Sequence, residues 1–296
     1  MTKNNELRLS VPPALFPVTY TNGPGLRYVL WVQGCSIRCC NHCLNPELQD
    51  PHQGVKTTVT EVLEHICKLK ETIPIQGITI LGGEPTDQSL ALSQLLPEIQ
   101  KQNLSVMLYT GHPFEALIKP DTPAEISQLL LAVDILVEGM YNPHLDFPGT
   151  LWRGSVNQRL LLLSQRYNVP LIKSILQNTI QHIEPNVEMI QYVGRSSIIC
   201  KFWGESLPIQ QTQEQKKSLS QPQEIMEILY NGHPITSWIP ELADSPPSDI
   251  RLLSPKGITG VLDADNQLHL FGFQKGDVVQ QFKQALLGQG ININFE

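Results

Sequence analysis

Basic residues are scarce in this 296-residue sequence: 21 Lys and Arg stand against 28 Asp and Glu, a formal net charge of −7 at pH 7. Wide binding of nucleic-acid phosphates depends on clustered Lys and Arg, so we expect no nucleic-acid partner. The chain also lacks a run of ~20 apolar residues, which a membrane-spanning helix requires. Its first ten residues lack the apolar core of a secretory signal. We therefore expect a cytoplasmic protein with no membrane association.

Cysteine is also uncommon, but it is concentrated in one place. The sequence has six cysteines, and four of them fall within residues 35–43. Disulfides are rare in the cytoplasm, so such a dense group indicates metal binding. Cys67 and Cys200 lie in a predicted helix and a predicted strand, where we expect small buried apolar side chains.

Strand-like and helix-like segments alternate along the first two thirds of the chain. Hydrophobic residues make up 41% of the sequence and charged residues 17%, which is typical of a folded globular protein. We predict strands over 26–33, 77–81, 105–109, 134–137, 170–175 and 197–202, and helices over 60–72, 89–102 and 124–132. Such alternation favours parallel βα units with right-handed crossovers. The predicted fold class is therefore α/β, with an open or partial (β/α) barrel.

The remaining third of the chain has a different composition. Residues 205–224 are rich in Gln, Ser and Lys and have too few apolar groups to bury a face, which indicates a linker or flexible insertion. Residues 257–273 then predict a hairpin that turns through 263–266, followed by a helix over 277–287 and a strand over 291–295. The predicted parts are a barrel domain at 1–204, a linker or irregular insertion at 205–255, and a small ββαβ module at 256–296.

The cysteine loop provides candidate metal ligands in Cys35, Cys39, Cys40 and Cys43. Three thiolates can hold a cubane iron–sulfur cluster and leave one iron open to a further ligand. In this interpretation Cys35 and Cys43 are the outer ligands, and Cys39 and Cys40 compete for the third position. One alternative is the set Cys35, Cys39 and His42, with an imidazole in place of one thiolate. The others are a four-ligand zinc site made of His42 and three of the cysteines, and inert buried thiols.

A glycine-rich turn follows the predicted strand at 77–81. Gly82 and Gly83 let the backbone approach a ligand closely, and Pro85 closes the turn. Exposed carbonyls and the Glu84 carboxylate can accept the three N–H donors of an ammonium group. Loops at the carboxyl ends of barrel strands carry the chemistry, and both this turn and the cysteine loop occupy such positions.

The segment WRGSVNQR at 152–159 offers further polar side chains. Arg153, Asn157 and Arg159 are candidates for binding a carboxylate or a ribose, because arginine presents several donors in one plane. Alternatively, the segment caps a following helix through Ser155, with Arg159 on a solvated face.

These segments together resemble a known family. WVQGCSIRC followed by CLNPE resembles the cluster loop of radical S-adenosylmethionine (SAM) activating enzymes, with one residue inserted into their CxxxCxxC pattern. The GGEP turn resembles the turn with which radical SAM proteins hold the SAM amino group. Asp134 to Gly139, in which Glu138 stands where the family has Asp, and the RGSVNQR segment resemble parts of the activases of anaerobic ribonucleotide reductase, as does Tyr109 with the two residues after it. The resemblance covers roughly residues 24–165.

The resemblance implies a radical SAM oxidoreductase. It implies a [4Fe-4S] cluster on the cysteines, and reductive cleavage of SAM to a 5′-deoxyadenosyl radical that abstracts a glycine hydrogen from a partner glycyl radical enzyme. The reductant would be a protein such as flavodoxin or ferredoxin. The implied cofactor-binding residues are Gly82, Gly83, Glu84, Pro85, Tyr109, Arg153 and Asn157. Two other hypotheses are radical SAM modification of another peptide or small metabolite, and a non-catalytic iron–sulfur or zinc protein that binds a partner.

Overall fold

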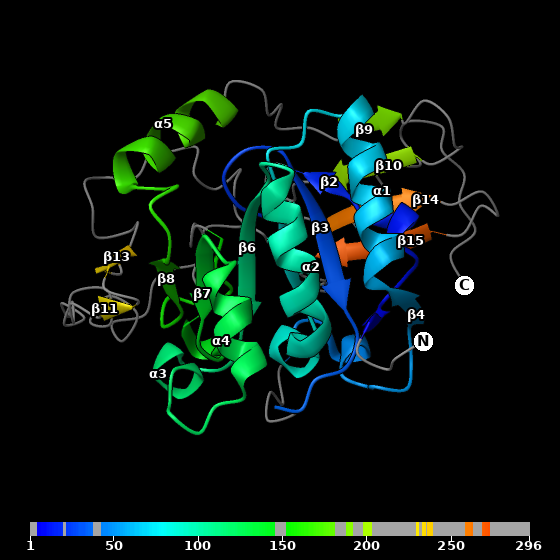
Figure 1. Ribbon diagram of the computed structural model, residues 1–296. Helices are drawn as coiled ribbons and strands as arrows, with labels where there is room; N and C mark the ends of the chain where they lie inside the picture. The colour runs from blue at the N-terminus through cyan, green and yellow to red at the C-terminus, as the bar shows by residue number, and fades with distance from the viewer. Residues whose placement is uncertain are drawn as a thin grey trace.

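A mixed β-sheet organises the chain in the computed structural model (Figure 1). The structure describes residues 5–19, 22–37, 43–145 and 152–180, together with short strands at 188–191, 198–202, 229–230, 233–234, 236–238, 258–262 and 268–272. None of the helices in these described residues is both long enough and apolar enough to span a membrane.

Four neighbouring parallel strands form the centre of the sheet: β3 (Arg27–Val32), β5 (Gly77–Gly82), β6 (Ser105–Thr110) and β7 (Ile135–Glu138). Every residue of β3 and of β7 is buried. Parallel strands that are covered on both faces have such continuous apolar sequences. The strands predicted in these four places are confirmed.

Three helices connect these strands: α1 (Val59–Thr72), α2 (Ser89–Lys101) and α4 (Ala124–Leu131). Figure 1 shows them side by side over one face of the sheet, and α2 contacts both α1 and α4. A capping box starts α1, in which Thr58 Oγ1 accepts from the Glu61 backbone N–H and Glu61 Oε2 accepts from the Thr58 N–H. The three helices predicted here are confirmed.

Antiparallel strands flank the parallel centre. β1 (Glu6–Leu9) lies between β3 and β4 (Val55–Thr58), and β2 (Val18–Thr19) also pairs with β3. On the other side, β8 (Arg159–Leu162) runs antiparallel to β7, and β13 (Thr236–Trp238) pairs with β8. Short helical turns complete this part: η2 (Pro13–Leu15), η3 (Pro46–Leu48), η4 (Pro85–Gln88), α3 (Phe114–Leu117) and η5 (Pro143–Leu145). The partial barrel stays a prediction.

The strand predicted over 170–175 is wrong, because these residues lie inside the helix α5 (Val169–Ile180). The Asn168 side chain accepts a hydrogen bond from the Leu171 N–H (2.8 Å), as a helix N-cap does. Pro170 stands in the first turn, where a missing N–H costs nothing. The fully buried Ile172 faces the core at helical spacing from Val169 and Ile175.

A second, antiparallel sheet has the order β15-β14-β10-β9 and contains the other late strands. Residues 197–202 do form a strand, β10 (Ile198–Phe202), but it pairs with β9 (Glu188–Gln191) and β14 (Ile258–Leu262) and does not extend the parallel series. The predicted hairpin is confirmed by the pairing of β14 with β15 (Leu268–Gly272). The hairpin turn, the helix at 277–287 and the strand at 291–295 lie outside the described residues.

The segment predicted as a linker contains three short strands. β11 (Leu229–Tyr230) pairs with β12 (His233–Pro234), and β13 joins the main sheet through β8. Strands on both sides of this segment also pair with one another, β10 with β14. The division into three parts stays a prediction.

Candidate functional site

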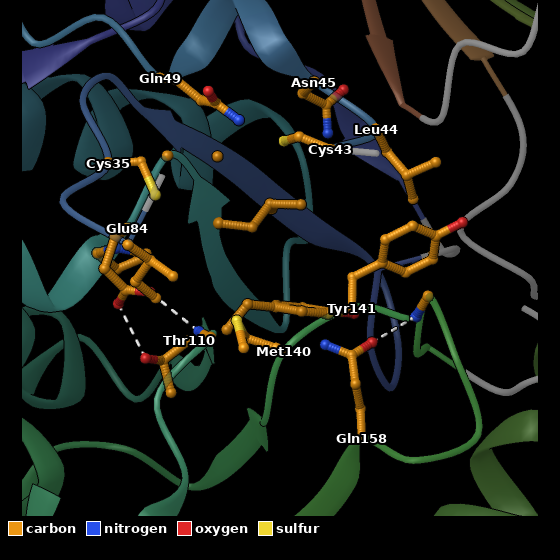
Figure 2. Close-up of a pocket in the computed structure, with 18 of the residues that line it drawn as sticks. Cys35, Cys43, Leu44, Asn45, Gln49, Glu84, Thr110, Met140, Tyr141 and Gln158 are labelled. Carbon is orange, nitrogen blue, oxygen red and sulfur yellow. Dashed lines mark hydrogen bonds between the residues drawn. The ribbon is translucent and has the colours of Figure 1, made fainter. Parts of the chain in front are cut away.

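An open pocket of about 140 Å³ lies at the carboxyl ends of β3, β5 and β6 (Figure 2). The lining includes seven residues that the sequence singles out: Cys35, Cys43, Gly82, Gly83, Glu84, Pro85 and Tyr109. The structure therefore brings the cysteine loop and the glycine-rich turn together in one pocket.

Two cysteine thiols face this pocket. Cys35 and Cys43 are both half-buried and neither forms a disulfide. Figure 2 shows them on the same side of the pocket, with Glu84 nearer to Cys35. Sulfur donors on a mostly apolar wall that includes Ile37 and Leu81 fit an iron–sulfur cluster, whose ligands are thiolates.

The third ligand falls beyond what the structure describes. Cys39, Cys40 and His42 all lie in the undescribed residues 38–42. Within the described part of the chain, no group of three His, Cys, Asp or Glu residues is placed to hold a metal ion. The choice between Cys39 and Cys40 therefore stays a prediction.

Backbone hydrogen bonds join the glycine-rich turn to the residues just before the cysteine loop. The Gly83 N–H donates to the Val32 carbonyl (2.9 Å), and the Glu84 N–H donates to the Gly34 carbonyl (2.8 Å). A Cβ atom at position 83 would lie 1.9 Å from the Gly34 oxygen, so no other residue fits this approach. The residue just before Cys35 is thus held by the turn itself.

Glu84 joins this turn to the loop after β6. Its buried carboxylate accepts from the Thr86 N–H (3.0 Å), the Thr86 hydroxyl (2.7 Å) and the Thr110 hydroxyl (2.8 Å) through Oε1. Oε2 accepts from the Gly111 N–H (2.9 Å). Most of the accepting capacity predicted for an ammonium group is therefore used by the protein, and Oε2 is the oxygen with room for a further donor.

Replacing Glu84 with glutamine tests this bridging role. A glutamine amide accepts through one atom only, so either the Thr86 or the Gly111 backbone N–H would lose its acceptor. We expect the free energy of unfolding of the metal-free chain to fall by ~1–3 kcal/mol, measured by urea denaturation. The control Glu64→Gln changes an exposed carboxylate on α1. An unchanged urea midpoint for Glu84→Gln would mean that the hydrogen bonds of Glu84 do not stabilise the fold.

Tyr109 lies on the pocket wall, and its hydroxyl donates to the Trp152 carbonyl (2.5 Å). Burial raises the pKa of Tyr109, so the hydroxyl stays protonated as a donor. Trp152 is fully buried and has a φ of +53°, which is rare for a bulky residue. This contact fixes the strained start of the 152–159 segment against β6.

Arg153 and Asn157 do not line the pocket. Arg153 is fully buried and donates to the Gln158 carbonyl (3.0 Å), and the Asn157 amide donates to the Met140 carbonyl (2.8 Å). Their predicted contacts with SAM stay predictions. Arg153 therefore fixes its own segment, whereas Asn157 holds the loop after β7, which forms part of the pocket wall at Gly139.

Gln158 is a pocket residue that the sequence did not single out. Its Oε1 accepts from the Gly154 N–H (2.8 Å) and the Ser155 N–H (3.2 Å), while its Nε2 donates to the Gly139 carbonyl (2.8 Å). Figure 2 shows it beneath Tyr141 on the wall away from the cysteines. The only available signal was its position between two candidate residues in the same motif.

The helix-cap alternative for this segment is wrong. No helix follows, since Arg159 begins the strand β8. The Ser155 hydroxyl instead accepts from the Asn142 N–H (3.1 Å). Arg159 is not on a solvated face, because it forms ion pairs with the buried Glu138 and with Glu115 (2.7 Å).

These ion pairs shift two pKa values. Burial opposes the charge of Arg159, but its two carboxylate partners raise its pKa. Burial is the largest single influence on Glu115 and acts to raise its pKa, but the hydrogen bonds from Arg159, a backbone hydrogen bond and the Arg159 charge together lower this pKa. Glu138 also accepts from the Phe114 N–H (3.0 Å), so the cluster ties α3 to β7 and β8.

The Glu115 pair predicts a small acid sensitivity. Because folding lowers the pKa of Glu115, its stabilisation is complete above the unfolded-state pKa and is lost as the pH falls through the folded-state value. Its side chain is 42% exposed, so solvent screening limits the effect to ~0.5 kcal/mol. Glu115→Gln should lower stability at neutral pH, and this loss should shrink as the pH falls below the ordinary pKa of a glutamate carboxyl, measured by urea unfolding. A loss that stays the same as the pH falls would contradict this assignment.

Comparisons with known proteins agree with the chemistry of the pocket. Residues 21–161 match the family model of a 4Fe-4S single cluster domain. An anaerobic ribonucleoside-triphosphate reductase-activating protein of Enterobacteria phage T4 is 34% identical over 152 residues, 49% of this chain and 90% of the relative. Proteins of the same name from Vibrio cholerae and Escherichia coli K12 are each 30% identical over 148 residues, 48% of this chain and 92% of each relative.

Proposed function

The chain belongs to the family of anaerobic ribonucleoside-triphosphate reductase-activating proteins, and from this premise we propose that it is a radical SAM enzyme. Its cysteine loop would hold a [4Fe-4S] cluster through Cys35, Cys43 and either Cys39 or Cys40. The activity would be the activation of a partner glycyl radical enzyme.

One observation carries this proposal: Cys35, Cys43 and the Gly82–Pro85 turn line the same pocket. Two thiols alone would suit zinc as well as iron. A glycine turn beside them, with its backbone pressed against the base of the cysteine loop, adds a place for a small ligand next to the metal. That combination suits a cluster with one open iron better than a closed structural site.

The residues of the chain divide the work of binding. The thiolates would hold the cluster, which when bound supplies the electron for reductive SAM cleavage. The Gly82 and Gly83 carbonyls and Glu84 Oε2 would accept the N–H donors of the SAM amino group. The apolar side chains of Trp31, Ile37 and Leu81 line the pocket and would exclude water from the SAM-binding position.

The partner is inferred from the names of the relatives, which activate an anaerobic ribonucleoside-triphosphate reductase. Incubating the reconstituted chain with such a reductase, SAM and dithionite should generate a glycyl radical, seen as a doublet in its electron paramagnetic resonance spectrum. If SAM is cleaved but the reductase shows no glycyl-radical doublet, the proposed partner is wrong, although the chain still cleaves SAM.

A second candidate is radical SAM modification of another peptide or small metabolite. It is favoured by the portion of the chain that the relatives do not match, since each alignment covers about half of it. Part of that portion, β13, pairs with the edge strand β8. A chain that ends before residue 205 should still activate the reductase under the first candidate, whereas the second requires the remainder for turnover of its own substrate.

A further inference from the structure

We propose that Asp87 is a positioning residue for Cys35, holding the cysteine loop in the orientation that directs its thiol into the pocket. This role rests on the proposed function, because it concerns a cluster ligand. Asp87 itself does not line that pocket. It lies on η4, just after the glycine-rich turn.

Asp87 binds the residue that follows Cys35 at two points. Its Oδ2 accepts from the Ser36 backbone N–H (2.7 Å), and its Oδ1 accepts from the Ser36 hydroxyl (2.7 Å). Hydrogen bonds to a carboxylate are shorter and stronger than those between neutral groups. With both oxygens engaged, Asp87 fixes the direction in which the chain leaves Cys35.

Gln88 holds the chain on the N-terminal side of Cys35 through hydrogen bonds to Gln33 and Arg8. Its Nε2 donates to the Gln33 carbonyl (3.0 Å) and the Arg8 carbonyl (2.8 Å), and its Oε1 accepts from the Arg8 N–H (2.8 Å). Consecutive residues of η4 therefore hold the chain before and after Gly34 and Cys35. The Cys35 N–H is held separately by the Gln49 carbonyl (3.2 Å).

Packing cannot replace these bonds on this side of the loop. A second hollow, distinct from the pocket, is lined by Cys35, Ser36, Asp87 and Gln88. Both Ser36 and Asp87 are exposed there. The loop next to Cys35 is therefore positioned by hydrogen bonds rather than by a buried apolar contact, and removing the carboxylate would leave it mobile.

The test compares Asp87→Ala, Asp87→Asn and Ser36→Ala with the unaltered full chain. In the metal-free protein, hydrogen exchange at the Ser36 amide should be about tenfold faster in Asp87→Ala. After anaerobic reconstitution, the visible absorbance of the cluster should decay about tenfold faster in a chelator. Asp87→Asn and Ser36→Ala, which each keep one acceptor or donor, should fall between. Asp121→Asn removes an exposed carboxylate elsewhere and serves as the matched control.

A double variant with Ser36→Ala and Asp87→Ala separates the contact from general damage. If the contact is responsible, the double variant should lose its cluster no faster than Asp87→Ala alone. Cluster decay in Asp87→Ala at the rate of Asp121→Asn would overturn the positioning role while leaving the proposed function intact. An unaltered chain that takes up no iron would overturn the proposed function and this role with it.

Discussion

Replacing Cys35 or Cys43 with alanine should abolish formation of the iron–sulfur cluster and leave the domain folded. Each change removes a thiol from the pocket, and a cubane held by three protein thiolates does not survive on two. Iron and sulfide content after anaerobic reconstitution measures the loss, and the thermal unfolding of the metal-free chain checks the fold.

Cys67 provides the matched control for these variants. It is a half-buried cysteine on α1 and does not line the pocket. Cys67→Ala should bind as much iron as the unaltered chain. Full iron content in Cys35→Ala would contradict its assignment as a ligand.

The third ligand can be identified in the same way. Cys39→Ala and Cys40→Ala differ only in which of two adjacent thiols is removed. Since one position remains to be filled, one variant should lose SAM cleavage and the other should keep it. Equal losses in both would mean that the loop does not bind metal through one of these residues alone.

Replacing Gly83 with alanine should give the other large effect. The added Cβ would lie 1.9 Å from the Gly34 oxygen and 2.9 Å from the Leu48 oxygen, and both of these atoms belong to the backbone. The turn must then move away from the cysteine loop. We expect a loss of ~2–3 kcal/mol in the free energy of unfolding, measured by urea denaturation, together with loss of SAM cleavage.

Gly139→Ala separates steric overlap from backbone strain. Gly139 has a φ of +96°, but a Cβ there would meet its nearest atom only at 3.8 Å. Its cost should be the ~1–2 kcal/mol of a left-handed conformation alone. A Gly83→Ala chain as stable as Gly139→Ala would show that the turn does not press on Gly34 as the structure describes.

Strong local patterns made much of the fold predictable from the sequence. The apolar residues of α1 recur at helical spacing, and β3 and β6 are continuous apolar runs at the length of a buried strand. Other short apolar runs fit a buried strand and a buried helix equally well. Residues 170–175 looked like a buried strand but form part of α5, and Arg159–Leu162 was missed as the strand β8.

The candidate site was predictable where residue type alone specifies chemistry. Cysteines at close spacing and glycines at a strand end mark the pocket directly, and Cys35, Cys43 and Gly83 all line it. The roles of Asp87 and Gln158 were not predictable, because they depend on hydrogen bonds to residues distant in sequence or to backbone groups. Nothing local in the sequence marks such partners.

The hydrogen-bond partners of the buried arginines were also not predictable from the sequence. Arg27 is fully buried at the start of β3, where it donates to Thr79 Oγ1 (2.7 Å) and Ser105 Oγ (2.8 Å), and burial lowers its pKa. Its sequence context, within an apolar strand, gives no sign of these acceptors. Arg153 likewise turned inward to a backbone carbonyl, although arginine is more often exposed.

The most direct test of the proposed chemistry is SAM cleavage by the full chain after anaerobic reconstitution. With dithionite and SAM, we expect about four irons per chain and accumulation of 5′-deoxyadenosine, detected by liquid chromatography. A chain that binds this iron and leaves SAM intact would contradict the account.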